Sequence, residues 1–187
     1  MKKIVHIVNP NGLGHLRRSI FIWNNINIKN LSIKLLIDHS QEKYLSFFKP
    51  KSFISFELMN FNGMITLSNI KNKNFASNYF NMHNEFNNSI NFQELDLLIS
   101  DNTLFDFGEF CKDYLVFGSF FWHDIIKDNN SLKEVCQNEK KILLKNSPEI
   151  YGINNFISGS LKEYDFVKTI GWLVHQKKKK IKSIQRR

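Results

Sequence analysis

Residues 4–18 read IVHIVNPNGLGHLRR. The first five are apolar except for one histidine, and a short apolar run of this kind is typical of a strand buried on both faces of a parallel sheet. The NPNG segment that follows ends the strand, because proline and glycine break regular structure. From residue 15 to residue 25, Leu16, Ile20 and Trp23 recur on one side of a helix. This stretch therefore predicts a strand, a tight loop and a helix.

Strand-like and helix-like segments alternate along the rest of the chain. Further strands are expected at Leu31–Ile37, Phe53–Leu58, Leu95–Ile99, Tyr114–Phe117, Glu149–Ile153 and Phe166–Ile170, and further helices at Gln41–Phe48, Phe75–Ile90 and Ser131–Lys145. Ser131 is the expected N-cap of the last helix, with Glu134 completing a capping box. The asparagine-rich residues 59–74 have no clear period and are expected to form a loop. This alternation predicts an α/β fold with a doubly wound parallel sheet.

Charge is concentrated at one end of the chain. The 187 residues carry a formal net charge of +9, and seven of those charges lie in Gln176–Arg187, which contains no acid, so the rest carries only +2. We therefore expect one domain over residues 1–172, followed at 173–187 by a basic tail or a truncated interdomain linker. Nucleic acid is not an expected partner, since the charge in the domain is not interleaved with aromatic residues.

Several sequence features indicate a cytoplasmic protein. The two cysteines, Cys111 and Cys136, are too few for a disulfide scaffold and lack metal-binding spacing. The six histidines are scattered, so neither a metal nor another cofactor is expected. The apolar run at the N-terminus is too short for a signal peptide, and no stretch is long enough to cross a bilayer. The basic tail leaves room for peripheral contact with an anionic membrane at its inner face.

The loop after the first strand is the leading candidate site, because ligands of open α/β sheets bind beyond the carboxyl ends of the strands. Gly12 and Gly14 allow the backbone to approach a ligand, and the helix that follows presents free N–H groups. Asn11 lies in the same loop. Arg17 is a candidate contact for a phosphate or an acidic partner; the alternative is that it is only a solvated helix residue. His15 is a candidate general base; the alternative is that it only caps the first turn. The loop lacks the dinucleotide and P-loop glycine patterns.

Two later strand ends carry the remaining candidates. Asp101 follows the strand at 95–99 and is the best partner for His15, because a carboxylate fixes the tautomer of a histidine; the alternative is an N-cap. Ser119, Trp122 and His123 follow the strand at 114–117 and are candidate substrate-binding residues, since an aromatic wall stacks well on sugars or lipids. The alternative for this third loop is an aromatic anchor that packs it down.

The run Gly12-Leu13-Gly14-His15-Leu16-Arg17-Arg18 resembles the G-x-G-H-x-x-R opening of GT-B glycosyltransferases, both MurG-like and UDP-glycosyltransferase-like. It is also similar to the nucleotide-sugar hydrolases of pseudaminic acid synthesis. The resemblance implies a Rossmann-like half-domain of an enzyme with two such domains, in which the N-terminal half binds the acceptor and the other half binds the nucleotide-sugar, without a metal ion. His15 would then deprotonate an acceptor hydroxyl with the help of Asp101, whereas in the hydrolases it would act on water.

A GT-B enzyme needs about twice this length, so the resemblance implies one half of an enzyme. We expect the acceptor-binding half of a glycosyltransferase for envelope glycan or glycoconjugate synthesis, inactive without its donor domain. Its expected partners are a nucleotide-sugar donor, held by a missing C-terminal domain or a separate subunit, and a glycan or lipid-linked acceptor. A hydrolase fragment, or a non-catalytic module that recruits a donor subunit or a membrane, are the alternatives. Arg18 is expected to be only a solvated helix residue.

Overall fold

The computed structural model describes residues 1–107, 111, 113–146, 148–153 and 156–170. Within these residues, seven strands form one sheet in the order β3-β2-β1-β4-β5-β6-β7, and every neighbouring pair is parallel. The strands are β1 (Lys2–Ile7), β2 (Leu31–Asp38), β3 (Ile54–Met59), β4 (Leu97–Asp101), β5 (Tyr114–Phe117), β6 (Glu149–Ile153) and β7 (Val167–Ile170). The predicted doubly wound parallel sheet is confirmed.

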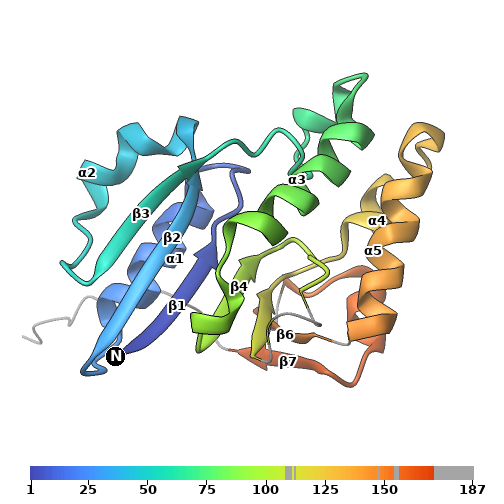
Figure 1. The fold of residues 1–187 in the computed structure, drawn as a ribbon. Coiled ribbons are helices and arrows are strands. Elements are labelled where there is room, and N and C mark those ends of the chain that lie inside the picture. Colours follow the sequence, from blue (N-terminus) through green and yellow to red (C-terminus); the bar gives the residue numbers. More distant parts are fainter. Residues whose placement is uncertain (108–110, 112, 147, 154–155, 171–187) are drawn as a thin grey trace, which may run out of the picture.

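The helices form one layer on each face of the sheet (Figure 1). They are α1 (Leu13–Asn25), α2 (Leu45–Phe48), α3 (Phe75–Ser89), α4 (Trp122–Ile126) and α5 (Lys133–Asn146). α1 and α2 pack on one face through a core that includes Leu16, Ile20 and Trp23, the three residues predicted to share a helix face. α3 and α5 pack on the other face, where Phe86 and Ile142 join a second core.

β1 lies in the middle of the sheet and is covered on both sides. Val5 and Ile7 belong to the core beneath α3 and α5, whereas Ile4 and Val8 belong to the core beneath α1. Each fully buried side chain of this size contributes roughly 1.5–3 kcal/mol by leaving water. The near-continuous apolar run that predicted this strand therefore reflects burial on two faces rather than one.

The strand order reverses between β1 and β4, which are neighbours in space although two strands separate them in the sequence. The chain leaves β1 toward α1 on one face of the sheet, whereas α3, which precedes β4, and α5, which follows β5, pack on the other face (Figure 1). Ligands of doubly wound sheets bind in the crevice that such a reversal opens at the carboxyl edge. The loops predicted to carry chemistry after residues 8 and 101 meet at this point.

Some local predictions need correction. The segment predicted as one helix at 41–48 is a 3₁₀ helix, His39–Tyr44, followed by the short α2, because Asp38 caps the 3₁₀ turn through the N–H of Ser40. Ser131 is not the N-cap of the last helix. It lies inside a 3₁₀ turn, Asn130–Leu132, that directly precedes α5. Asn129 caps this turn, and its Oδ1 accepts hydrogen bonds from the backbone N–H and the hydroxyl of Ser131, at 3.1 and 2.6 Å.

Residues 171–187, which include the predicted basic tail or linker at 173–187, lie outside the described residues. In the part of the chain that is described, no helix is both long and apolar enough to cross a membrane. The same residues contain no cluster of three His, Cys, Asp or Glu side chains placed to hold a metal ion.

Candidate functional site at the carboxyl edge of the sheet

His15 and Asp101 are in direct contact, as the sequence predicted. Nδ1 of His15 lies 2.7 Å from Oδ2 of Asp101. His15 stands in the first turn of α1, and Asp101 is the last residue of β4. The Asp101 side chain is 1% exposed and the His15 side chain 22% exposed. The carboxylate is therefore an internal support, whereas the imidazole is partly exposed at the carboxyl edge of the sheet.

Arg18 completes this pair, against the prediction that it is a solvated helix residue. Its guanidinium Nη2 donates a hydrogen bond to Oδ1 of Asp101 and lies 3.1 Å from Nδ1 of His15. Arg18 follows His15 by three positions, so both project from the same side of α1 toward the end of β4. This spacing was the signal in the sequence that could have identified Arg18, because residues three or four positions apart lie on the same side of a helix.

The protonation pattern of this trio follows from the carboxylate. Burial raises the pKa of Asp101, but the hydrogen bond from His15 and the charges of His15 and Arg18 outweigh burial, so the pKa lies below its usual value. An ionised carboxylate only accepts hydrogen bonds, and Nδ1 of His15 must therefore carry the hydrogen. The lone pair of the neutral ring is then at Nε2. This is the tautomer in which a histidine acts as a general base.

A second histidine, His6 of β1, is buried beneath α1 and is linked through side chains of that helix to its first turn. Burial lowers the pKa of His6 to about 4, so the ring is neutral. Nε1–H of Trp23 donates to Nδ1 of His6 at 3.0 Å, which leaves the hydrogen of His6 on Nε2, 3.4 Å from Oγ of Ser19. The Ser19 hydroxyl donates in turn to the carbonyl of His15 at 3.0 Å. This buried chain orients the backbone of His15, and sequence reasoning missed it because its members lie on two elements.

The loop before α1 is held by polar contacts to its neighbours. Oδ1 of Asn9 accepts from the N–H of Asn11 at 2.8 Å, and Nδ2 of Asn9 lies 3.3 Å from the hydroxyl of Thr103 in the loop after β4. Gly12 has a φ of +92°, which disfavours any residue with a side chain. No side chain caps α1, so the alternative role of His15 as a cap is wrong.

The other predicted residues of this loop lie at its rim. Asn11, Gly12 and Gly14 are exposed, and a Cβ built on either glycine would meet no atom within 4 Å. This space leaves the backbone of the first turn open to a ligand. Arg17 is also exposed, but it borders a groove between α1 and α2 rather than the His15–Asp101 contact.

The third predicted loop divides into two parts. Ser119 borders a small hollow that Arg18 and Tyr151 also line, so it lies beside the His15 trio. Trp122 and His123 are buried: Nε1–H of Trp122 donates to the carbonyl of Asn102 at 2.9 Å, and Nδ1 of His123 lies 2.8 Å from Oε2 of Glu139. These contacts are those of an anchor that ties the loops after β4 and β5 to α5.

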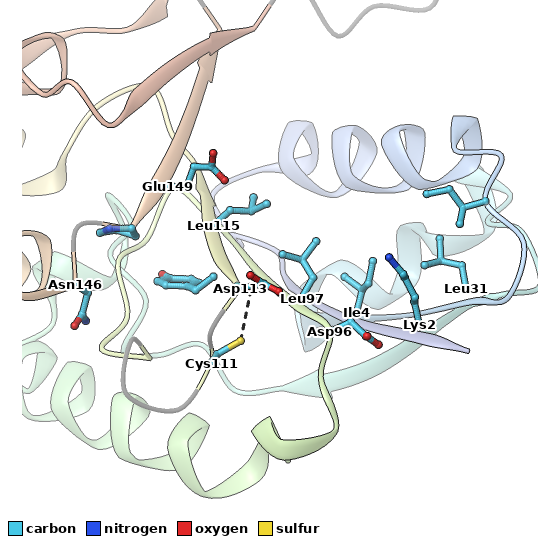
Figure 2. A pocket seen from close by; sticks show the side chains of 13 residues that line it. Lys2, Ile4, Leu31, Asp96, Leu97, Cys111, Asp113, Leu115, Asn146 and Glu149 are labelled. Carbon is cyan, nitrogen blue, oxygen red and sulfur yellow. Dashed lines mark hydrogen bonds between the residues drawn. The ribbon is translucent and has the colours of Figure 1, made fainter.

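A larger hollow than the one beside Ser119 lies elsewhere. Its volume is about 580 Å³, and it lies at the amino ends of β1, β4, β5 and β6, with Lys2, Asp96 and Glu149 at its rim and Ile4 and Leu97 in its wall (Figure 2). All strands are parallel, so this hollow and His15 are at opposite edges of the sheet. The candidate site is therefore an open surface at the carboxyl edge and not an enclosed cavity.

The strand order and the parallel pairing define a Rossmann-like α/β fold. No protein-family model and no curated protein matches the sequence. Solved structures of plant glycosyltransferases with the GT-B fold match it. Phytolacca americana UGT2 complexed with UDP-2fluoro-glucose and pterostilbene is 12% identical with a TM-score of 0.56, over 95% of this chain and 55% of that chain. Arabidopsis thaliana UGT89C1 complexed with UDP is 11% identical with a TM-score of 0.57, over 94% and 50%. The chain thus spans about half the length of these enzymes and has the fold of one half.

Proposed function

We propose that the chain is the acceptor-binding half of a glycosyltransferase that moves a sugar from a nucleotide-sugar to a hydroxyl acceptor. The observation that carries the proposal is the His15–Asp101 contact of 2.7 Å at the carboxyl edge of the sheet, with the ring partly exposed and the carboxylate buried. This pair occupies the place where ligands of such sheets bind. The likeness to UDP-bound and acceptor-bound glycosyltransferases supports the same conclusion through the fold.

In the proposed reaction, Nε2 of His15 takes the proton of the acceptor hydroxyl as its oxygen attacks the anomeric carbon. The bond between that carbon and the nucleotide diphosphate breaks, and the nucleotide leaves with the electron pair. The imidazolium that forms is stabilised by the negative charge of Asp101. Arg18 fixes the position of that carboxylate through its hydrogen bond. General-base catalysis of this type contributes about 10²–10⁴-fold to a rate.

The donor site belongs, in this proposal, to a second domain or subunit of the kind that completes the matched enzymes. The acceptor is a glycan or a lipid-linked hydroxyl, and envelope glycan or glycoconjugate synthesis is the proposed setting. A nucleotide-sugar hydrolase is the alternative that the same trio supports, because water and an alcohol present the same O–H group to Nε2 of His15.

The experiment uses the chain isolated from its source organism together with any polypeptide that co-purifies. UDP-glucose and UDP-N-acetylglucosamine are supplied with or without octyl glucoside and a simple phenol, and UDP, free sugar and glycoside are measured. Acceptor-dependent glycoside that disappears in His15→Ala supports the proposal. Free sugar without acceptor favours the hydrolase. If His15→Ala forms as much glycoside as the wild type, His15 is not the base.

A further inference from the structure

The outer side of α1 and α2 carries aromatic and basic side chains that the His15 trio does not use. A groove of about 630 Å³ lies between the two helices, with Arg17 and Asn24 from α1 on one side and Phe47 and Phe48 from α2 on the other. Phe47 is 74% exposed.

Basic residues surround Phe47. The Nζ of Lys43 lies 5.1 Å from the ring centroid of Tyr44, and that ring is 6.4 Å from the ring of Phe47. On the other side, Asn24 in the groove bonds the carbonyl of Lys49 at 3.2 Å and the N–H of Lys51 at 2.9 Å. These contacts place the lysines at the two ends of one patch.

We name this patch the α1–α2 surface. It comprises Arg17, Lys43, Phe47, Lys49 and Lys51, all of them exposed. The only acid in residues 39–53 is Glu42, so the three lysines of this segment outnumber its carboxylates, and Arg17 of α1 adds a fourth cation to the patch. The surface combines a prominent apolar side chain with an excess of positive charge.

We propose that the α1–α2 surface binds an anionic lipid bilayer, with Phe47 entering the interface and the four cations contacting lipid headgroups. Amphipathic helical surfaces bind membranes in this way, through apolar insertion supported by electrostatic attraction. Single-stranded nucleic acid is less well matched, because it stacks successive bases on several rings and Phe47 is the only aromatic residue of this surface classed as exposed.

The position of the surface fits the chemistry proposed above. Arg17 follows His15 by two residues, so the α1–α2 surface and the His15 trio share the first turns of α1. Membrane binding would bring the carboxyl edge of the sheet close to the headgroups, where the hydroxyl of a lipid-linked acceptor is located. The docking itself does not depend on the proposed reaction, since it concerns side chains outside the trio.

The test measures co-sedimentation of the full chain with phosphatidylcholine vesicles that contain or lack phosphatidylglycerol. We expect binding only to the anionic vesicles. Phe47→Ser is expected to weaken it about tenfold, from the apolar area that no longer leaves water. The double variant Lys49→Gln with Lys51→Gln is expected to weaken it about thirtyfold.

Leu144→Ser is the matched control, because Leu144 is also 74% exposed but lies on α5, on the opposite side of the sheet. It should bind as the wild type does. The basic residues 177–182 are tested separately by changing their lysines to glutamine. The proposal is overturned if the wild type does not bind anionic vesicles, or if only the 177–182 variant loses binding. It is also overturned if a single-stranded oligonucleotide displaces the protein from the vesicles. Circular dichroism melting of each variant identifies loss of fold, and binding is compared only between variants with wild-type melting.

Discussion

Arg18 and His15 approach the same carboxylate from one side of α1: Arg18 donates to Oδ1 of Asp101, and Nδ1 of His15 lies 2.7 Å from Oδ2. Each oxygen of the carboxylate thus has its own partner. Because Asp101 is almost completely buried, its charge depends on both contacts. The consequences of this arrangement can be measured for stability as well as for activity.

Replacement of His15 by alanine should abolish transfer in the complete enzyme and leave the fold intact. Loss of the ring removes the proposed base, which corresponds to about 10²–10⁴-fold in kcat. It also leaves Oδ2 of the buried Asp101 without its partner, so the variant should stay folded but lose about 1–3 kcal/mol of stability. Steady-state kinetics and thermal melting measure the two effects. Asn25→Ala is the control on the same helix, since Asn25 is exposed and lies at the far end of α1 from His15. A similar loss in both variants would show that the effect is not specific to the base.

Arg18→Gln should destabilise the protein by about 2 kcal/mol at neutral pH, because Oδ1 of Asp101 loses its charged donor inside the protein. The pKa of Asp101 is lowered by folding, so the stability linked to its charge is present above the unfolded pKa, about 3.9, and is lost as the pH falls through the lower folded value. The difference between wild type and variant should therefore shrink at acid pH. Urea unfolding at pH 7 and pH 3 measures it, and a difference that does not change with pH would contradict this account.

Gly12 and Gly14 should respond differently to the same substitution. Gly12→Ala forces a side chain to adopt a φ of +92° and should cost about 1 kcal/mol or more, although the space around it is open. Gly14 is inside α1 without a positive φ, so Gly14→Ala should be neutral or stabilise by up to about 1 kcal/mol. Chemical denaturation of the two variants gives the comparison. Equal effects would show that the backbone of the loop is not strained at Gly12.

Acid should destabilise the protein through two buried histidines. Burial lowers the pKa of His6 and that of His83 to about 4, below the unfolded value of about 6.5. Their neutral forms are retained in the folded state, so stability is complete above pH 6.5 and falls between pH 6.5 and 4, by up to about 3 kcal/mol for each ring. The urea midpoint measured across this range should decline less in His83→Phe than in the wild type. An identical dependence of the urea midpoint on pH in the two proteins would show that folding does not lower the pKa of His83.

Much of the fold was predictable because β1, β4, β5 and β6 are short apolar runs between breakers. The first and last residues of β5 and β6 are those predicted. Gly118 and the residues around 147 mark sharp changes in the apolar pattern of the sequence. The Asp38 cap and the 3₁₀ turn were not predictable, because one hydrogen bond decides between two helix types of similar stability.

The site was predictable only in part. His15 and Asp101 follow strand ends, and parallel strands bring such ends to one edge, so their meeting followed from the pattern. Arg18 follows His15 by three positions and Arg17 by two, so helix geometry places Arg18 on the side of His15, a spacing that the prediction of a solvated Arg18 did not use. Trp122 and His123 have residue types that suit a sugar-binding wall, yet their contacts with Asn102 and Glu139 depend on how α4 packs on α5.

The sequence by itself determined the parallel α/β sheet, the loop at residues 9–14 and the pairing of His15 with a carboxylate after β4, because these depend on local periodicity and on the rule that strand ends share an edge. Only the tertiary structure decided that Arg18 shares that carboxylate, that His6 supports α1 and that Phe47 remains outside the core. Those outcomes depend on helix rotation and on the packing of distant side chains, which the order of residues along one segment does not specify.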